Sequence, residues 1–166
     1  MKTAFANTFA ELALADPRHV LLTGDYCFGL FDELKRERPL QYWNCGVCEQ
    51  TMVGVAAGLA ISGLVPWVYT ITPFLIERAF EQIKLDVDAQ KLKVVLVGFD
   101  DYERDGPTHN PLNPKAMVNL LHNVHYIAPR DSAETVLYTK ECAILNKPAF
   151  LRLRNAPVWP KEGRDA

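Results

Sequence analysis

Residues 44–50 read Asn-Cys-Gly-Val-Cys-Glu-Gln and precede a segment rich in small residues. Glu49 stands at the expected junction of a strand with a helix, and its spacing leaves two interpretations open. A glutamate in the first turn of a helix interacts favourably with the helix dipole and needs no further role. Alternatively, apolar surroundings disfavour the charged form, so that a buried carboxyl group facing a ligand becomes a useful proton carrier.

Cys45 and Cys48 form a lone Cys-x-x-Cys pair directly before Glu49. Such a pair is typical of a redox site or of half a zinc site. The chain offers no second pair of ligands at a suitable spacing, so we expect two small, partly buried thiols and no metal. With Cys27 and Cys142 the total is four cysteines, too few for a disulfide scaffold at this length.

A second reactive stretch, Asp-Gly-Pro-Thr-His at residues 105–109, follows the apolar run 94–98. Glycine and proline favour a fixed turn, which would present Asp105 and His109 beyond the end of a buried strand. A histidine in a polar loop is equally often a plain surface residue. The remaining histidines have no comparable setting and are expected to be structural: His19, His122 and His125.

Apolar periodicity alternates between strand and helix patterns along the whole chain. Strands are expected at 19–23, 40–43, 65–70, 94–98, 124–127 and 149–153. Helices are expected at 3–15, 28–36, 49–62, 74–88, 115–121 and 132–146. This alternation predicts a three-layer α/β/α fold whose mainly parallel sheet has about six strands. Both reactive stretches follow strands, at the edge of the sheet where ligands bind in such folds.

Composition limits the classes of protein that need considering. A chain of 166 residues is long enough for one domain, and 49% hydrophobic with 23% charged residues excludes wholesale disorder. The net charge is −2 and the basic residues are not clustered, which argues against nucleic acid as a partner. Without an 18-residue apolar run or a signal-peptide pattern, we expect a cytoplasmic protein that does not enter a membrane.

Four motifs in consistent order resemble the pyrimidine-binding (Pyr) domain of the transketolase family, which includes 1-deoxyxylulose-5-phosphate synthase. They are Gly46–Gln50 continued by Met52–Ala60, Thr72–Phe74 with Arg78–Ile83, Asp105–His109, and Ala128–Asp131. The resemblance covers about residues 4–155. It implies a Pyr domain at residues 1–157, followed by a C-terminal tail at residues 158–166.

The resemblance implies thiamine diphosphate as the cofactor, bound between this domain and a diphosphate-binding (PP) domain. Glu49 matches the catalytic glutamate that hydrogen-bonds N1′ of the aminopyrimidine ring, and this bond promotes removal of the proton from thiazolium C2. His109 is the second expected catalytic residue. The other cofactor contacts implied are Phe74, whose ring would pack on the pyrimidine, with Arg78, Phe80 and Asp25.

The resemblance also implies substrate contacts from Asp105, His109 and Arg154, the last aligning with an arginine that binds sugar phosphate. Departures from the family argue against a standard sugar phosphate and predict a more aromatic pocket. The loop between Gly98 and Asp105 is shorter, and Phe99 stands near the position of another substrate histidine. Tyr26, Cys27 and Phe28 follow Asp25 where a phosphate-binding serine is expected, and Asn113-Pro114 replaces an expected acidic residue.

The Gly-Asp-Gly motif that holds diphosphate and Mg²⁺ in the family does not occur in this chain, and neither does a third transketolase domain. We therefore expect one subunit of a split enzyme, with Mg²⁺ on a separate PP chain and an α2β2 heterotetramer. The expected reaction transfers a two-carbon ketol or acyl unit from a ketose or 2-oxo acid to a carbonyl acceptor. The alternatives are a 2-oxo acid decarboxylase subunit and a non-catalytic, flavodoxin-like binding module.

Overall fold

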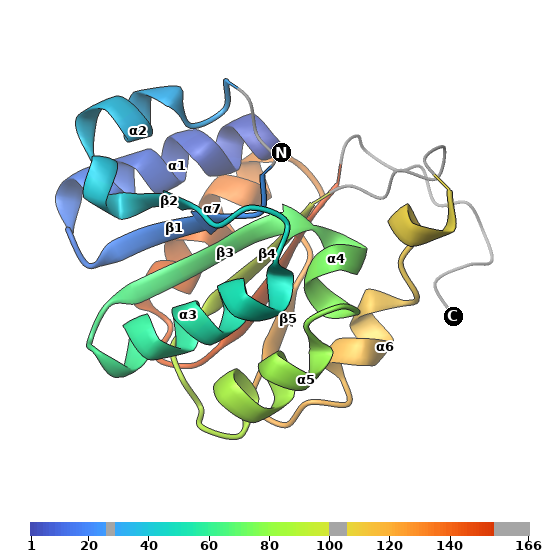
Figure 1. The fold of residues 1–166 in the computed structure, drawn as a ribbon. Coiled ribbons are helices and arrows are strands. Elements are labelled where there is room, and N and C mark those ends of the chain that lie inside the picture. The colour runs from blue at the N-terminus through green and yellow to red at the C-terminus, as the bar shows by residue number, and fades with distance from the viewer. Residues whose placement is uncertain (26–28, 100–105, 155–166) are drawn as a thin grey trace.

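Strands and helices alternate along the chain, as the apolar pattern predicts. The computed structural model describes residues 1–25, 29–99 and 106–154. Within them, six strands form one parallel sheet in the order β2-β1-β3-β4-β6-β5 (Figure 1). The strands are β1 (His19–Thr23), β2 (Tyr42–Asn44), β3 (Val65–Ile71), β4 (Val95–Phe99), β5 (His125–Ile127) and β6 (Ala149–Leu153). The expected α/β class and parallel sheet are confirmed.

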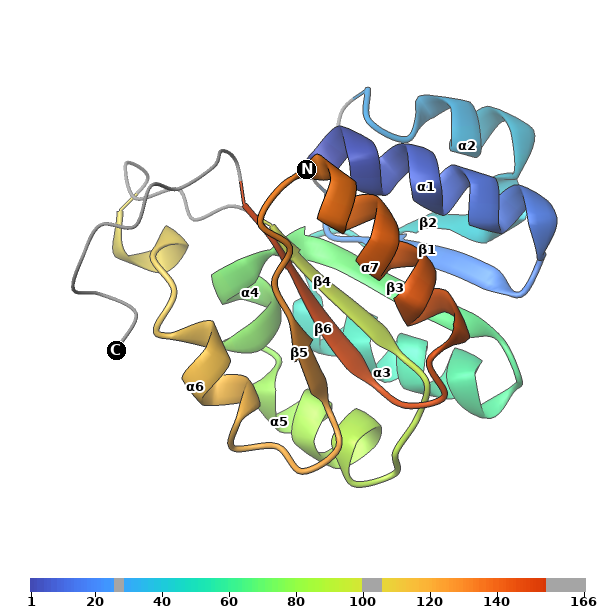
Figure 2. The ribbon, with the colours of Figure 1, turned by 180° about the vertical axis from the view of Figure 1, so that it is seen from behind.

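Helices cover both faces of the sheet. The α-helices are α1 (Lys2–Ala15), α2 (Asp32–Glu37), α3 (Glu49–Ile61), α4 (Thr72–Ile76), α5 (Phe80–Gln82), α6 (Pro114–Val118) and α7 (Ser132–Ile144). Helices α1 and α7 lie together over one face, whereas α3 to α6 lie over the other (Figure 2). No helix in the described ranges is both long and apolar enough to cross a bilayer.

The side chains of β3 point alternately into two buried clusters, one beneath each layer of helices. Trp67 and Tyr69 point into the cluster beneath α1 and α7, where the ring of Phe5 stacks on Tyr69 at a centroid distance of 5.3 Å. Val68 points into the other cluster, where it is buried with Met52 of α3. Successive side chains of a strand face opposite sides of a sheet, so a strand that is apolar throughout fits between two helical layers.

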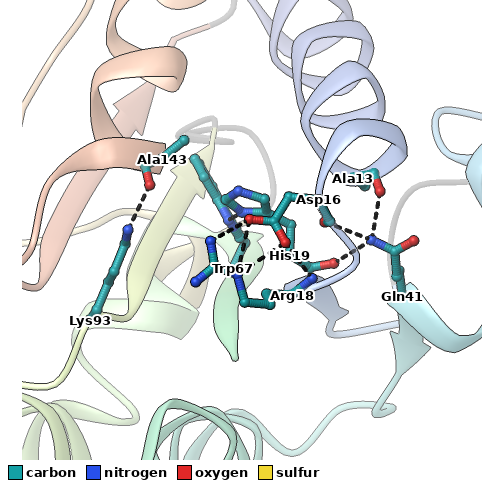
Figure 3. A network of polar contacts seen from close by, with 8 residues as sticks. All are labelled: Ala13, Asp16, Arg18, His19, Gln41, Trp67, Lys93 and Ala143. Carbon is teal, nitrogen blue, oxygen red and sulfur yellow. Dashed lines mark hydrogen bonds and ion pairs between the residues drawn. The ribbon is translucent and has the colours of Figure 1, made fainter. Parts of the chain in front are cut away.

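A polar network closes the amino-terminal edge of the sheet (Figure 3). The amide Nε2 of Gln41 donates hydrogen bonds to the backbone carbonyls of Ala13, Asp16 and His19 at 2.8, 3.3 and 2.9 Å. Trp67 Nε1 donates to His19 Nδ1 at 3.0 Å, which confirms that this histidine is structural. Desolvation lowers the pKa of His19, so the folded chain favours the neutral ring that this bond requires.

Two charged contacts flank this network. Arg18 donates to both carboxylate oxygens of Asp16, and these bonds lower the pKa of Asp16 to about 2. Lys93 Nζ donates to the carbonyl of Ala143 at 2.6 Å, which ties the chain before β4 to α7. The buried polar groups drawn in Figure 3 are thus hydrogen-bonded within the chain itself.

Some expected element boundaries are wrong. Helix α2 begins at Asp32, and residues 39–41 form a 3₁₀ turn, η1, because proline occupies its first position. The helix expected at 74–88 is in fact α4, α5 and a π-helical turn, η2 (Ile83–Asp88). The chain leaves α4 at Glu77 and turns through Arg78 before α5 begins. This break matters because it determines where Arg78 lies.

Candidate functional site

The carboxyl-terminal edge of the sheet gathers the segments that the sequence marks as reactive. Strand β1 lies between β2 and β3 in register, so the chain leaving each of these strands emerges at the same edge. Asp25 follows β1, Glu49 follows the short connection from β2, and Phe74 lies in α4, which follows β3 without a gap. His109 belongs to the 3₁₀ turn η4 (Pro107–His109), which contacts α4.

Glu49 is the first residue of α3, and its side chain is only 4% exposed. Arg78 Nη1 donates to Glu49 Oε1 across 3.4 Å, joining the start of α3 to the turn after α4. The location has two physical causes, since the helix N-terminus favours a carboxylate and the neighbouring guanidinium supplies a counter-charge. The carboxyl group predicted to be buried is therefore buried.

Aromatic contacts extend this pair to two further residues predicted for the site. The guanidinium carbon of Arg78 lies 3.6 Å from the centroid of the Phe74 ring, the geometry of a cation–π contact. The His109 ring meets Phe74 edge to face, with centroids 4.9 Å apart. Glu49, Arg78, Phe74 and His109 thus form one contiguous cluster, which we call the edge cluster.

Asn44, which the sequence analysis did not single out, connects the loops beside the edge cluster. Its Oδ1 accepts hydrogen bonds from the backbone N–H groups of Asp25 at 3.1 Å and Gly46 at 3.0 Å. Its Nδ2 lies 3.3 Å from Asp25 Oδ1. Asp25 and Gly46 both have positive φ, 49° and 73°, so this side chain stabilises two turns that leave the extended region. An asparagine two residues before a glycine is the sequence signal for such a turn.

Glu77 is a second residue that the sequence analysis missed. Its Oε1 accepts a hydrogen bond from the backbone N–H of Leu112 at 2.7 Å, which holds the chain after η4 against the end of α4. His109 lies three residues before Leu112, in the turn η4 that contacts α4. The sequence carries no signal for the hydrogen bond of Glu77, because a carboxylate that caps a loop 35 residues away has no fixed spacing.

Other predicted site residues lie apart from the edge cluster or outside the described ranges. Phe80 packs against the core beneath α3, and Arg154 follows β6 with its backbone N–H directed at Met1 Sδ, 3.2 Å away. Asp105 lies outside the described residues. Phe99 is 1% exposed and stacks on Tyr69 in the core, so its expected contribution to a more aromatic pocket is wrong. Tyr26 and Phe28, the other aromatic residues of that expectation, lie outside the described residues.

Buried hydroxyl groups also lie at this edge. Within the described ranges, Thr70 Oγ1 and Thr72 Oγ1 have no hydrogen-bond partner although both residues are at most 1% exposed. A Cβ added at Gly24 would lie 3.1 Å from Thr70 Oγ1, and one at Gly98 would lie 2.9 Å from Thr72 Oγ1. Glycine at these two positions therefore allows the backbone to pack closely against the two threonine side chains.

The two cysteines before α3 are half-buried and free. Cys48 Sγ donates to the carbonyl oxygen of Cys45 at 2.8 Å, whereas desolvation and the neighbouring thiol raise the pKa of Cys45. In the part of the chain that the structure describes, no three His, Cys, Asp or Glu side chains are grouped to hold a metal ion. Both thiols are partly buried, as expected from the sequence.

The edge cluster can bind a planar heteroaromatic ring. Phe74 contributes a half-buried aromatic ring that carries the Arg78 guanidinium on one face, and Glu49 offers a buried carboxylate that is able to exchange a proton or hydrogen bond with a ring nitrogen. The free threonine hydroxyls are further donors or acceptors at the same edge.

Comparisons with known proteins identify the family of the chain. Residues 1–157 match the family model described as "Transketolase, pyrimidine binding domain". The chain is 35% identical to 1-deoxy-D-xylulose-5-phosphate synthase of Syntrophus aciditrophicus, over 89% of this chain and 23% of that protein. It is 29% identical to a subunit of the apulose-4-phosphate transketolase of Phocaeicola vulgatus, over 95% of this chain and 52% of the relative.

Among solved structures, a split-gene transketolase described as an inactive beta4 tetramer matches with a TM-score of 0.84 and 29% identity. The match covers 93% of this chain and 51% of that one. Transketolase from Leishmania mexicana shares the fold with a TM-score of 0.79, at 24% identity over 92% of this chain and 25% of that one. The chain thus spans between about a quarter and about half the length of these relatives, and it belongs to the transketolase pyrimidine-binding domain family.

Proposed function

We propose that this chain is the pyrimidine-binding subunit of a split, thiamine-diphosphate-dependent enzyme of the transketolase type. One observation carries the proposal: the Glu49 carboxylate is buried at the start of α3 and is connected through Arg78 to the aromatic ring of Phe74. A ligand with a flat ring and a polar ring nitrogen matches that pair of groups. The aminopyrimidine of thiamine diphosphate is such a ring.

The residues present fit this cofactor. When bound, thiamine diphosphate supplies a thiazolium carbon that attacks carbonyl groups and stabilises the negative charge left after carbon–carbon cleavage. Glu49 would hold the aminopyrimidine by its ring nitrogen and share a proton with it, in a position where the protein excludes water. Phe74 would orient the same ring by stacking.

His109 is the proposed second catalytic residue. It contacts Phe74 edge to face, and its Nδ1 lies 3.0 Å from the Thr108 hydroxyl, which orients the ring. Its proposed role, contact with a substrate carbonyl or hydroxyl group, is the one that the family resemblance implies for this position. Asp105 and Arg154 are proposed substrate contacts, and Asp25 and Phe80 proposed cofactor contacts, all on the basis of the family.

A second chain completes the proposed site. One relative is named as a single subunit of its transketolase, and one solved relative is a split-gene transketolase whose beta4 tetramer is described as inactive. We therefore propose a partner PP subunit that carries the Gly-Asp-Gly motif, holds the diphosphate and Mg²⁺, and assembles with this chain as α2β2. The free thiols of Cys45, Cys48 and Cys142 suit a cytoplasmic location, where thiols remain reduced.

The proposed reaction transfers a two-carbon ketol or acyl unit from a ketose or 2-oxo acid to a carbonyl acceptor. Both named relatives at 29% identity are transketolases, which favours transfer over simple decarboxylation. Product analysis separates the two, because CO₂ released without carbon–carbon joining would identify a decarboxylase subunit.

Co-purification with the candidate partner chain tests the proposal. Turnover of ketose donors should require both chains, thiamine diphosphate and Mg²⁺ together. Activity of this chain alone would contradict the split arrangement. Failure to bind thiamine diphosphate with any partner would instead indicate a non-catalytic, flavodoxin-like module.

A further inference from the structure

We infer that Arg78 is a positioning residue that sets the separation between the carboxylate of Glu49 and the aromatic ring of Phe74. The inference rests on the proposed function, because it assigns Arg78 an effect on the cofactor that is exerted through these two residues. It differs from the role of direct cofactor contact that the family resemblance implies for Arg78.

The geometry around Arg78 allows one side chain to hold two others. The face of its guanidinium lies on the Phe74 ring at 3.6 Å, while Nη1 reaches Glu49 Oε1 at 3.4 Å. Both contacts form at once because the N–H groups of a guanidinium lie in its plane, leaving its face free to stack. A lysine ammonium, which is a compact point charge without a flat face, does not combine these contacts in the same way.

The break between α4 and α5 allows the Arg78 side chain to contact both Phe74 and Glu49. Phe74 lies within α4, whereas Arg78 lies in the turn that follows it, ahead of the α5 N-cap residue Ala79 at φ −106° and ψ 18°. The turn brings the Arg78 side chain back over Phe74 and toward α3, whose first residue is Glu49. One side chain therefore connects the helix that carries the carboxylate to the helix that carries the ring.

The surroundings of Glu49, Arg78 and Phe74 explain why loss of Arg78 should affect the other two side chains. Glu49 is 4% exposed, and among the described residues Arg78 supplies its salt bridge, whereas the Arg78 side chain is itself 38% exposed. The Phe74 ring contacts Arg78 on its face and His109 with its edge. Loss of Arg78 would leave a buried carboxylate without its counter-charge and would remove the cation from the face of the Phe74 ring.

Substitutions of Arg78 in the assembled two-chain enzyme test the inference. Arg78→Met removes charge and stacking, and we expect hydrogen–deuterium exchange at thiazolium C2 to slow about tenfold, as for loss of one charged hydrogen bond. Arg78→Lys retains the charge and should recover part of that rate. Arg130→Met is a matched control, because Arg130 pairs with Glu134 on an exposed surface far along the chain.

A double variant separates positioning from direct contact. If Arg78 acts through Glu49, Arg78→Met should slow exchange less than twofold further when Glu49→Gln is already present. Cofactor affinity, measured by calorimetry on the same assemblies, should change less than threefold in Arg78→Met. A large loss of affinity with full additivity of the two substitutions would identify a direct cofactor contact and overturn the inference.

A measurement on the chain without cofactor gives an independent readout. In ¹⁵N spectra the Nε–H of Arg78 should show restricted motion, and both Glu49→Gln and Phe74→Leu should release it. Unrestricted motion in the wild-type chain would contradict the inference. If Glu49→Gln leaves C2 exchange unchanged, the proposed function itself is wrong. If Glu49→Gln slows exchange but Arg78→Met does not, the proposed function stands and only the positioning role of Arg78 is wrong.

Discussion

The two edges of the sheet in this protein differ in how their buried polar groups are satisfied. At the amino-terminal edge, Gln41, His19 and Trp67 are hydrogen-bonded within the chain. At the carboxyl-terminal edge, the described residues leave the hydroxyls of Thr70 and Thr72 without partners, and buried Glu49 depends on a half-exposed arginine. The first edge thus satisfies its buried polar groups within the chain, whereas the second has unsatisfied groups, as the proposed cofactor site would require.

The largest effect should come from the carboxyl-terminal edge. Glu49→Gln should slow C2 hydrogen–deuterium exchange in the assembled enzyme by about 10²- to 10⁴-fold, the range for loss of a proton-transfer group. Thermal unfolding should show that the fold is retained. Glu81→Gln, an exposed residue of α5, is the control and should leave exchange unchanged. Wild-type exchange in the Glu49 variant would refute its role.

The amino-terminal edge should respond in stability and not in chemistry. Gln41→Ala removes the donor for three backbone carbonyls, and at about 1 kcal/mol for each hydrogen bond it should lower the free energy of unfolding by about 2–3 kcal/mol. Urea denaturation measures the loss, and Gln50→Ala, at an exposed position on α3, is the matched control. An equal effect of both substitutions would remove the difference between the edges.

The pH dependence of stability should also originate at the amino-terminal edge. Desolvation lowers the pKa of His19 below its ordinary 6.5, so as pH falls through 6.5 the unfolded chain gains a proton first. His19 therefore contributes stability that is complete above pH 6.5 and is lost as pH falls to the lowered pKa. Asp16, whose pKa is lowered to about 2, contributes stability that is lost only as pH falls from 3.8 to about 2.

Urea denaturation between pH 5 and pH 8 tests this assignment. His19→Gln, which does not titrate, should flatten the slope between pH 6.5 and pH 5 relative to the wild type. The exposed His122 provides a control, and His122→Gln should leave the slope unchanged. An unchanged slope in the His19 variant would show that other groups determine it.

The smallest change should be that of Thr70→Val. Its hydroxyl has no partner among the described residues, so an apolar residue of the same shape should alter the free energy of unfolding by less than about 0.5 kcal/mol. Thr135→Val is the matched comparison, since the Thr135 hydroxyl donates to the carbonyl of Asp131 at 2.7 Å, and it should cost about 1 kcal/mol. Equal losses for both would mean that Thr70 is hydrogen-bonded in solution.

Much of the fold could be predicted because apolar runs between helical patterns allow few other arrangements. The strand His19–Thr23 has its expected bounds, and its burial on both faces agrees with the apolar run at 20–22. The break after α4 could not be predicted, because residues buried at i, i+3 and i+4 spacing continue across it, as with Leu75, Ile76 and Ala79. The spacing of apolar residues indicates which face of a helix is buried, but it does not indicate whether the helix is continuous or broken.

The candidate site was predictable in part for similar reasons. The position of Glu49 at a strand-to-helix junction indicated burial, and the structure places it at the start of α3. Its contact with Arg78 joins residues 29 apart and depends on the break after α4, so no local pattern indicated it. Phe99 was misjudged because alternation along β4 directs it into the core, a fact that the sequence of a fully apolar strand does not reveal.

The most direct test of the central claim is a crystal structure of the two-chain assembly with thiamine diphosphate and Mg²⁺. The account predicts that a carboxylate oxygen of Glu49 lies within about 2.6–3.2 Å of the ring nitrogen N1′ of the aminopyrimidine. A Glu49 side chain still directed only at Arg78, with the aminopyrimidine bound elsewhere, would contradict it.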